Sequence, residues 1–137
     1  MIGLLYVLPL EGDGIECGAD DLDRLFQVRN PDGQWHLEIA RTDVMYPLLW
    51  VLLKDDVAVV WRVRVEGEPV EVANGDGSVP DSEWVEFRSR VGVEWVTGEH
   101  VIGVDRALRI VRALAEGELY PKSVEWIIPP LPGDHRD

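Results

Sequence analysis

Cysteine is almost absent from this sequence, which contains Cys17 and no other. A single thiol cannot form a disulfide within one chain, so the fold has to be stable without one. The 137 residues are enough to bury a core unaided, and no shift in composition divides them. We therefore expect one domain over residues 1–137, in the reducing cytoplasm. Residues 129–137 follow the chain's last strand candidate and are predicted to be a loose tail.

Basic residues are also scarce. Thirteen Lys and Arg stand against 26 Asp and Glu, which gives a formal net charge of −13. Nucleic acids and anionic membrane surfaces are bound through Lys and Arg, so this balance argues against both as partners. A basic protein partner fits the charge. Acidity that serves only to keep a small protein soluble fits it equally well.

Motifs for metal or cofactor chemistry are lacking as well. His36, His100 and His135 are far apart in sequence and have no cysteine pair beside them, so we expect no zinc site. The glycine-containing loop that begins at Asn74 lacks the Gly and Glu that a calcium loop carries at its sixth and twelfth positions. No phosphate-binding glycine loop and no serine-nucleophile motif is present. We therefore expect no metal, no cofactor and no catalytic residue.

Apolar runs long enough to cross a membrane are absent too, because none approaches ~20 residues. The first ten residues lack the basic flank of a signal peptide and are interpreted as a strand.

An amphipathic helix over about residues 104–116 is the clearest pattern in the chain. Its apolar residues share one arc of a helical wheel, and opposite charges spaced four apart line the other arc. Gly117 is placed to end the helix, and Pro121 prevents its resumption. Residues 123–128 then form a short strand. A helix that is apolar on one side needs a surface to cover, and the other segments predict a sheet.

The sheet is predicted from alternating and continuous apolar stretches. Residues 34–41 alternate, with Trp35, Leu37 and Ile39 inward and His36 on an exposed polar face. Residues 47–53 are apolar throughout, which indicates a central strand, and a turn at residues 54–56 leads back into residues 57–65. Further strand candidates are residues 2–10, 68–73, 84–90 and 93–96, whereas residues 11–19 are predicted to be a loop.

Local hairpins dominate this order of elements. The predicted fold class is therefore α+β, a largely antiparallel β-sheet with the long helix (about 104–116) and a short helix (about 20–30) packed on it.

Tryptophan and acidic residues supply the candidate binding surface. Five of the six tryptophans are expected in or beside the core: Trp35, Trp50, Trp61, Trp95 and Trp126. Trp84 differs, because it follows an acidic stretch and lies on a face expected to be polar. An exposed Trp among carboxylates suits a protein-binding hot spot, although the ring could also fold back over the loop. The candidate partner-binding residues are Asp76, Asp81, Glu83, Trp84 and Glu86, with Asp55 and Asp56 of the predicted turn.

The segment DRALRIVRALAEGELYPKSVEW resembles the C-terminal signature of the "Imm-one" family of bacterial polymorphic-toxin immunity proteins. That signature is an amphipathic helix, a turn with Gly and Pro, and a strand ending in Trp, and Gly117, Pro121, Val124 and Trp126 occupy its positions. A looser resemblance extends upstream to the strand at Trp35 and the following hairpin, roughly two thirds of the chain. The turn at residues 118–120 is fuller than the pattern, and residues 127–128 continue beyond the Trp.

The resemblance implies a cytoplasmic protein, not an enzyme, that binds and neutralises a cognate secreted toxin domain by stoichiometric inhibition. Toxins paired with the family include nucleic-acid-targeting enzymes such as deaminases or nucleases. A toxin of this kind carries a basic channel that an acidic protein can approach rapidly. The matched residues look like determinants of the fold, so the resemblance supplies no contact residues.

Two other hypotheses stay open at this point. One is a small carboxylate-based enzyme or ligand-binding domain, which would need a deep pocket lined by paired acids. The other is an assembly or chaperone subunit that pairs through an exposed strand edge.

Overall fold

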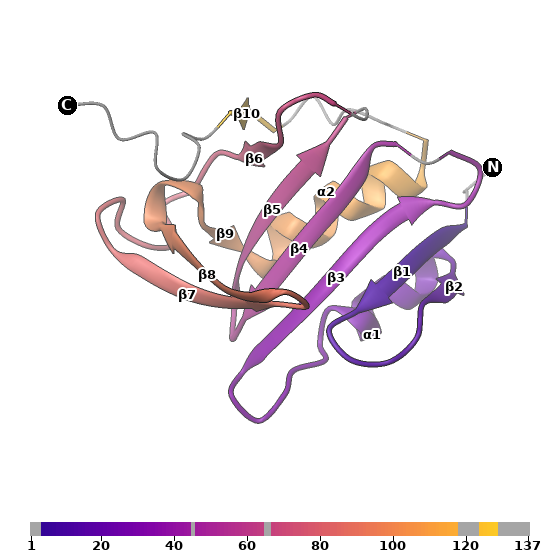
Figure 1. The fold of residues 1–137 in the computed structure, drawn as a ribbon, viewed down its shortest axis with the longest axis horizontal. Coiled ribbons are helices and arrows are strands. Elements are labelled where there is room, and N and C mark those ends of the chain that lie inside the picture. Colours follow the sequence, from indigo (N-terminus) through magenta and orange to yellow (C-terminus); the bar gives the residue numbers. More distant parts are fainter. Residues whose placement is uncertain (1–3, 45, 65–66, 118–123, 129–137) are drawn as a thin grey trace.

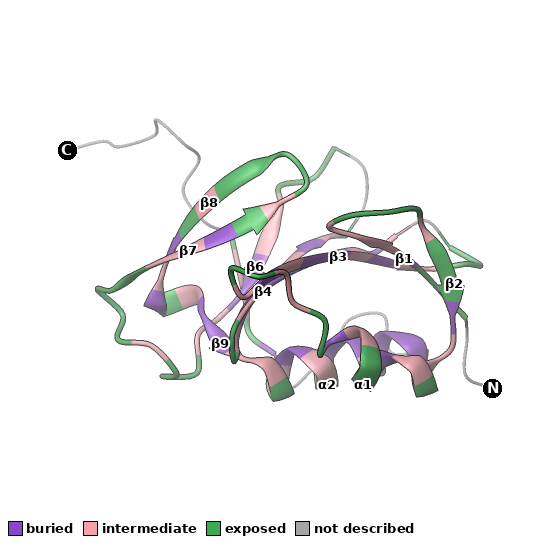
Figure 2. Ribbon diagram, turned by 90° about the horizontal axis from the view of Figure 1, so that it is seen from below, coloured by how far each residue is buried: buried purple, intermediate pink, exposed green. Residues whose placement is uncertain are grey.

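A large antiparallel sheet organises the chain in a computed structural model, which describes residues 4–44, 46–64, 67–117 and 124–128. Two helices lie on one face of this sheet, and a β-hairpin stands on the other (Figures 1 and 2). The fold is therefore α+β, as predicted. The predicted tail, residues 129–137, lies outside the described residues.

The strands of the large sheet follow the order β10-β6-β5-β4-β3-β1-β2, with β9 beside β5, and every neighbouring pair is antiparallel. Their bounds are β1 Leu5–Pro9, β2 Ile15–Cys17, β3 Gln34–Arg41, β4 Leu48–Lys54, β5 Val57–Val63, β6 Glu71–Ala73, β9 Ile102–Gly103 and β10 Trp126–Ile127. The apolar strand β4 lies at the centre, which confirms its prediction. Sheet neighbours and layers on both faces exclude water from it.

The strands β2 and β9 were not predicted. β2 falls in residues 11–19, which were interpreted as a loop, and β9 pairs Gly103 and Ile102 with the start of β5. Strands of three and two residues have no measurable period, so an apolar pattern cannot reveal them. The end predicted for the fifth strand, Val65, lies outside the described residues.

The long helix, α2 (Val104–Ala115), has the predicted bounds to within one residue. The residues of its predicted apolar arc face the sheet, and five of them are buried: Ala107, Ile110, Val111, Leu114 and Ala115. Gly117 ends the helix with a φ of 98°, which side chains other than glycine rarely adopt. Its N–H donates to the carbonyl of Leu114, an arrangement that satisfies one of the helix's last free carbonyls.

The short helix is present but ends earlier than predicted. A 3₁₀ turn, η1 (Ala19–Asp21), runs into α1 (Leu22–Leu25), five residues short of the expected end near residue 30. Arg29 explains the early end, because its guanidinium donates to the carbonyls of Phe26 (2.6 Å) and Val28 (2.7 Å). These carbonyls are thereby satisfied without a further helical turn.

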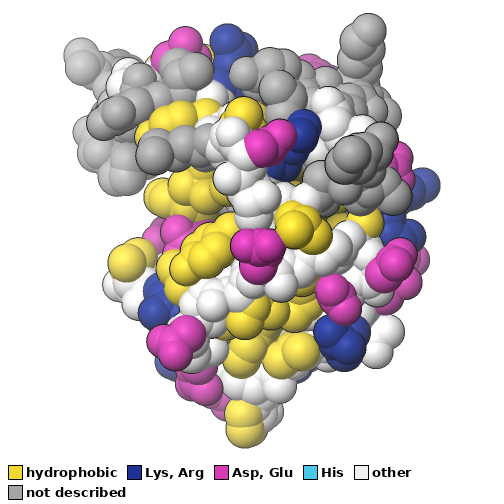
Figure 3. All heavy atoms as spheres, turned by 90° about the vertical axis from the view of Figure 1, so that its right-hand side faces the viewer, with side chains coloured by type: hydrophobic (Ala, Val, Ile, Leu, Met, Phe, Trp, Pro, Cys, Tyr) yellow, Lys and Arg dark blue, Asp and Glu magenta, His cyan; other side chains and the backbone are white. Residues whose placement is uncertain are grey.

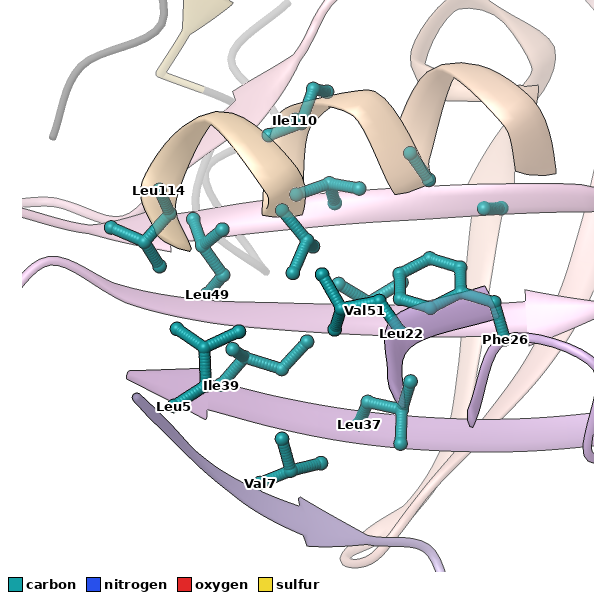
Figure 4. Packing of buried hydrophobic residues seen from close by; sticks show 14 of the residues in the cluster. Leu5, Val7, Leu22, Phe26, Leu37, Ile39, Leu49, Val51, Ile110 and Leu114 are labelled. Carbon is teal, nitrogen blue, oxygen red and sulfur yellow. The ribbon is translucent and has the colours of Figure 1, made fainter. Parts of the chain in front are cut away.

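The main core lies between the sheet and the two helices. Inward side chains of β1, β3 and β4 meet Leu22 of α1, Phe26 at the end of α1, and Ile110 and Leu114 of α2 (Figure 4). Burying each such Leu, Ile or Phe stabilises the fold by roughly 1.5–3 kcal/mol. Arg112 of α2 also reaches Asp23 of α1, with 2.6 Å between Nη2 and Oδ1, and joins the two helices at the surface.

A second cluster lies on the opposite face of the sheet, under the hairpin of β7 (Trp84–Ser89) and β8 (Gly92–Thr97). Leu52, Val59 and Val72 of the sheet pack there against Phe87 of β7 and Val96 of β8. The hairpin crosses one end of β3, β4 and β5 (Figure 1).

Candidate functional site

Two side chains of β3 hold the hairpin on the sheet. Gln34 donates from Nε2 to the carbonyl of Glu86 (3.0 Å) and accepts at Oε1 from the N–H of Arg88 (3.0 Å). His36 accepts at Nδ1 from the N–H of Arg90 (3.3 Å). Side chains here satisfy backbone groups that a neighbouring strand would otherwise satisfy. The position of β7 is therefore fixed along its whole edge.

The prediction of an exposed His36 is wrong, because the hairpin covers this end of the sheet and leaves the residue 4% exposed. Its pKa is lowered, chiefly by burial and further by Arg90, while Glu38, 3.3 Å from Nε2, opposes the shift. The alternation in residues 34–41 separated the two faces correctly. It could not show that a hairpin 50 residues later would cover the polar one.

The outward face of the hairpin carries the candidate site's aromatic residues. Three cross-strand pairs share this face: Trp84 with Thr97, Glu86 with Trp95, and Arg88 with Val93. The side chains of Trp84 and Trp95 are 61% and 60% exposed, and they lie diagonally across the two strands. The exposure of Trp84 decides between the two alternatives that the sequence left open, in favour of an exposed ring and against one folded back over the loop.

The prediction that Trp95 lies in or beside the core is wrong. β8 alternates, and its alternation puts Val93 and Trp95 on one side and Glu94 and Val96 on the other. From β8 alone, the side with the Trp looks like the inward one. The register with β7 decides otherwise, because Trp95 pairs with Glu86 while Val96 pairs with Val85. Cross-strand register was the signal that could have found this second exposed tryptophan.

Asp76 has a structural role. Its Oδ1 accepts hydrogen bonds from the N–H and hydroxyl of Ser78, and its Oδ2 accepts one from the N–H of Gly103 (3.0 Å), the residue that precedes α2. Burial raises the pKa of this carboxyl. The hydrogen bonds from Gly103 and Ser78, together with the charge of Arg106, lower the pKa by more, so that the net shift is downward. Asp76 therefore stays ionised and anchors its loop to the start of the helix.

The loop of residues 74–83, to which Asp76 belongs, is also held at its other end. The 3₁₀ turn η2 (Gly98–His100) lies under it, the N–H of Gly98 donates to the carbonyl of Glu83 (2.8 Å), and that of Gly75 donates to Glu99 (2.7 Å). Gly98 has to be glycine, because a Cβ there would clash with the carbonyl of Pro80. These contacts hold the segment that carries the exposed residues Asp81 and Glu83 and leads into Trp84.

The other predicted site residues lie elsewhere. The carbonyl of Asp56 accepts from the N–H of Val104 (3.1 Å) at the start of α2, where Asp76 is also bound. A hollow of about 420 Å³ lies there, lined by Asp56, Val57, Ser78, Gly103, Val104 and Asp105. Asp55 is at the β4–β5 turn, and its carbonyl accepts two bonds from Arg29. Asp81, Glu83, Trp84 and Glu86 thus follow one another into β7, whereas Asp55 is bound at the β4–β5 turn and Asp56 and Asp76 are bound at the start of α2.

Features typical of catalysis are lacking among the described residues. The described residues include no group of three or more His, Cys, Asp or Glu side chains placed to hold a metal ion. Their buried polar side chains are Gln34, His36 and Arg62, none of them a carboxylate. Cys17 is buried, and burial together with Asp21 raises its pKa, which disfavours the thiolate. No helix in these ranges is long and apolar enough to span a bilayer.

β1 and β2 also expose apolar side chains. Leu4, Tyr6 and Ile15 are about half exposed, and Tyr6 and Ile15 are on opposite faces of the sheet, because Ile15 pairs with the buried Val7. Figure 3 shows this side of the molecule, with hydrophobic side chains at the surface among acidic and basic ones. It has no tryptophan as exposed as those of the hairpin.

No protein-family model matches the chain, and no curated protein matches it either. The function has to be argued from the surfaces just described.

Proposed function

We propose that this protein acts by binding another protein, a cognate toxin domain with a basic surface, and inhibits it stoichiometrically in the cytoplasm. The observation that supports this most is the pair of tryptophans on the outward face of the β7–β8 hairpin. The resemblance to immunity proteins supplies the class of partner, and nucleic-acid-targeting toxins such as deaminases or nucleases fit it best.

The exposed tryptophans support a protein partner because large apolar rings gain stability when they are removed from water. Trp84 and Trp95 each leave about three fifths of their surface exposed. Tryptophan is enriched among the residues that contribute most to interfaces, where its truncation typically costs ~2 kcal/mol or more. The hairpin holds both rings in place on a backbone that the main sheet supports.

The charge around these rings supports a basic partner. Asp81 and Glu83 precede Trp84, and Glu86 is opposite Trp95 on the outward face, where three carboxylates therefore stand near the rings and Arg88 is the one basic neighbour along β7. A toxin that acts on nucleic acid needs a positively charged channel, and carboxylates around an aromatic centre complement such a surface. We therefore centre the contact surface on Glu83, Trp84, Glu86 and Trp95, with Asp55, Asp56 and Asp76 toward its periphery.

The carboxylate-based enzyme is the weaker hypothesis. It needs acids in an apolar pocket that raises a carboxyl pKa. In the described part of the chain the acids of the candidate site are exposed or half-exposed, and the one with a shifted pKa, Asp76, is shifted downward.

Charge reversal at the hairpin tests the proposal. The partner is the toxin domain encoded beside this gene, and the variant is Glu83→Lys combined with Glu86→Lys. We expect its association rate to fall by about tenfold or more at low salt, because electrostatic steering is lost, while thermal unfolding stays unchanged. Stopped-flow binding and a toxin activity assay measure the two effects.

A matched control carries the same change in charge on the helix side of the molecule, Asp20→Lys with Glu116→Lys, both at exposed positions. This control should associate nearly as fast as the unchanged protein. Equal rates for both double variants would remove the hairpin from the interface. Failure of the unchanged protein to bind or inhibit the toxin would refute the proposed function itself.

A further inference from the structure

The outer edge of β8 carries backbone groups that no described strand pairs with. The N–H of Gly98 donates to the carbonyl of Glu83, which makes this a hydrogen-bonded pair. In an antiparallel ladder such pairs alternate with pairs that do not exchange bonds. With the register Trp84 to Thr97, the bonded pairs are 85/96, 87/94 and 89/92. The N–H and C=O groups of Val93 and Trp95 therefore point away from β7.

The other strand edges among the described residues are bonded to side chains or short. Gln34 and His36 already satisfy the outer edge of β7. The described outermost strands of the large sheet, β2 and β10, have three and two residues. β8 has six, and Figure 2 shows an exposed stretch along it.

In the described part of the chain, β8 has only one of the devices that protect an edge, the inward-pointing carboxylate of Glu94. Edge strands usually carry Lys, Pro, a bulge or a covering segment that discourages pairing with another chain. The sequence of β8, GVEWVT, has no Lys, Arg or Pro, and its outward residues Val93 and Trp95 are 47% and 60% exposed. Its register with β7 is continuous from 92 to 97, so no bulge interrupts it.

We propose that β8 accepts an extended segment of the partner as a third strand of the hairpin sheet, and that this segment carries basic side chains. The two N–H and two C=O groups of Val93 and Trp95 supply up to four backbone hydrogen bonds, and Trp95 packs against the side chains of the added strand. This inference rests on the proposed function only in taking the partner to be a protein.

Charge identifies the occupant. The side chains of an added strand lie beside Glu94 of β8 on the inner face, and Glu86 of β7 is one strand further away on the outward face, opposite Trp95. Arg90, at the tip, is directed to carbonyl oxygens of the β1–β2 loop. A second copy of this chain would bring the same carboxylates together at a net charge of −13, which opposes pairing. A basic segment is attracted instead.

Amide hydrogen exchange measured by NMR tests the inference. In the free protein the amides of Val93 and Trp95 should exchange fast, whereas those of Glu94 and Val96, which donate to β7, should be protected. The probe is an acetylated peptide of alternating Lys and Val, seven residues long, and the control peptide replaces each Lys by Glu. At a Lys–Val peptide concentration ten times its dissociation constant, exchange at Val93 and Trp95 should slow roughly tenfold.

A proline variant tests the backbone contribution. Val93→Pro removes an outward N–H without touching a β7–β8 bond, and Val93→Thr is the matched control that keeps the N–H and the branched side chain. We expect the proline variant to bind the Lys–Val peptide about fivefold more weakly and the threonine variant to bind it unchanged. Protection of Glu94 and Val96 verifies that both variants keep the hairpin.

Three results would overturn the inference. They are no protection of Val93 and Trp95 by the Lys–Val peptide, equal protection by the Glu–Val peptide, or protection that rises with protein concentration alone, which would identify a second copy as the occupant. Each of these leaves toxin inhibition intact if the proposed function holds. Peptide binding without toxin binding would instead refute the proposed function and leave the strand-accepting edge in place.

Discussion

His36 occupies a place where an uncharged imidazole is required. Its Nδ1 accepts the N–H of Arg90, and protonation would put a second donor opposite that group. Burial and Arg90 lower its pKa against the opposing effect of Glu38. The unfolded chain has an ordinary imidazole with a pKa near 6.5. At low pH the unfolded chain therefore binds a proton at His36 more readily than the folded protein does. The contribution of His36 to the free energy of unfolding is fully present above the unfolded pKa and is lost as the pH falls.

This linkage predicts a pH dependence of stability. The free energy of unfolding should fall as the pH drops from about 7.5 to about 5, and His36→Asn should flatten the slope, because an amide oxygen can accept the same bond without titrating. Urea unfolding across this range measures it. His100→Asn, which removes a histidine elsewhere in the chain, is the control variant. Asp76, whose pKa lies below 3.8, acts only at lower pH. An unchanged slope in His36→Asn would contradict the assignment.

Single residues were the hardest features to predict from sequence. Trp84 was found because acidic neighbours marked its face as polar, but Trp95 was not, because an aromatic in an alternating strand looks inward until its partner strand is known. His36 failed for the opposite reason, since a polar residue on a polar face looks exposed until the hairpin is placed over it. In both cases long-range pairing overrode a correct local pattern.

At the scale of elements, the attachment of the hairpin depends on Gln34. Its amide serves both the carbonyl of Glu86 and the N–H of Arg88, and the residue is 3% exposed. Buried backbone groups that lose such a partner keep the cost of desolvation.

Gln34→Ala should therefore lower the free energy of unfolding by about 2–3 kcal/mol. It should also speed amide exchange at Arg88 more than in the β3–β4 pair. Gln27→Ala is the matched control, because Gln27 is exposed and should change the stability by less than about 0.5 kcal/mol. A loss in Gln34→Ala no larger than in the control would mean that apolar packing alone holds the hairpin.

Most long elements were predictable because their patterns repeat. The helix α2, the alternating strand β3 and the apolar strand β4 each extend over enough residues for a period or a continuous run to be measured. β2 and β9 are too short to show a period, and each pairs with the edge of a longer strand, β1 or β5, so their own sequences did not predict them. The sequence also did not predict the different roles of the acidic candidates. Asp76 accepts a hydrogen bond at the start of α2, whereas the residues from Asp81 to Glu86 continue into β7.

At the scale of the molecule, the formal charge of −13 opposes compaction. The described ion pairs, such as Arg62 with Glu71 (2.9 Å) and Arg112 with Asp23 (2.6 Å), act at short range and leave the net charge unchanged.

Salt should therefore stabilise the protein. Raising NaCl from about 0.02 M to about 0.5 M shortens the screening length from roughly 20 Å to roughly 4 Å, which weakens long-range repulsion more than close pairs. We expect the melting temperature to rise over this range, as followed by circular dichroism. The variant Asp20→Lys with Glu116→Lys, which has a smaller net charge, should rise less. A fall in melting temperature would show that the local ion pairs dominate.

The two-sided use of the large sheet has an evolutionary consequence. One face is committed to the helices, and substitutions there disturb the main core. The hairpin on the other face is anchored through its inward side chains and its β7 edge, so positions 84, 86, 93, 95 and 97 can be exchanged without altering either core. A lineage of such proteins could therefore change partners quickly while its scaffold stays constant, and comparison of relatives should find the greatest sequence divergence on this strip.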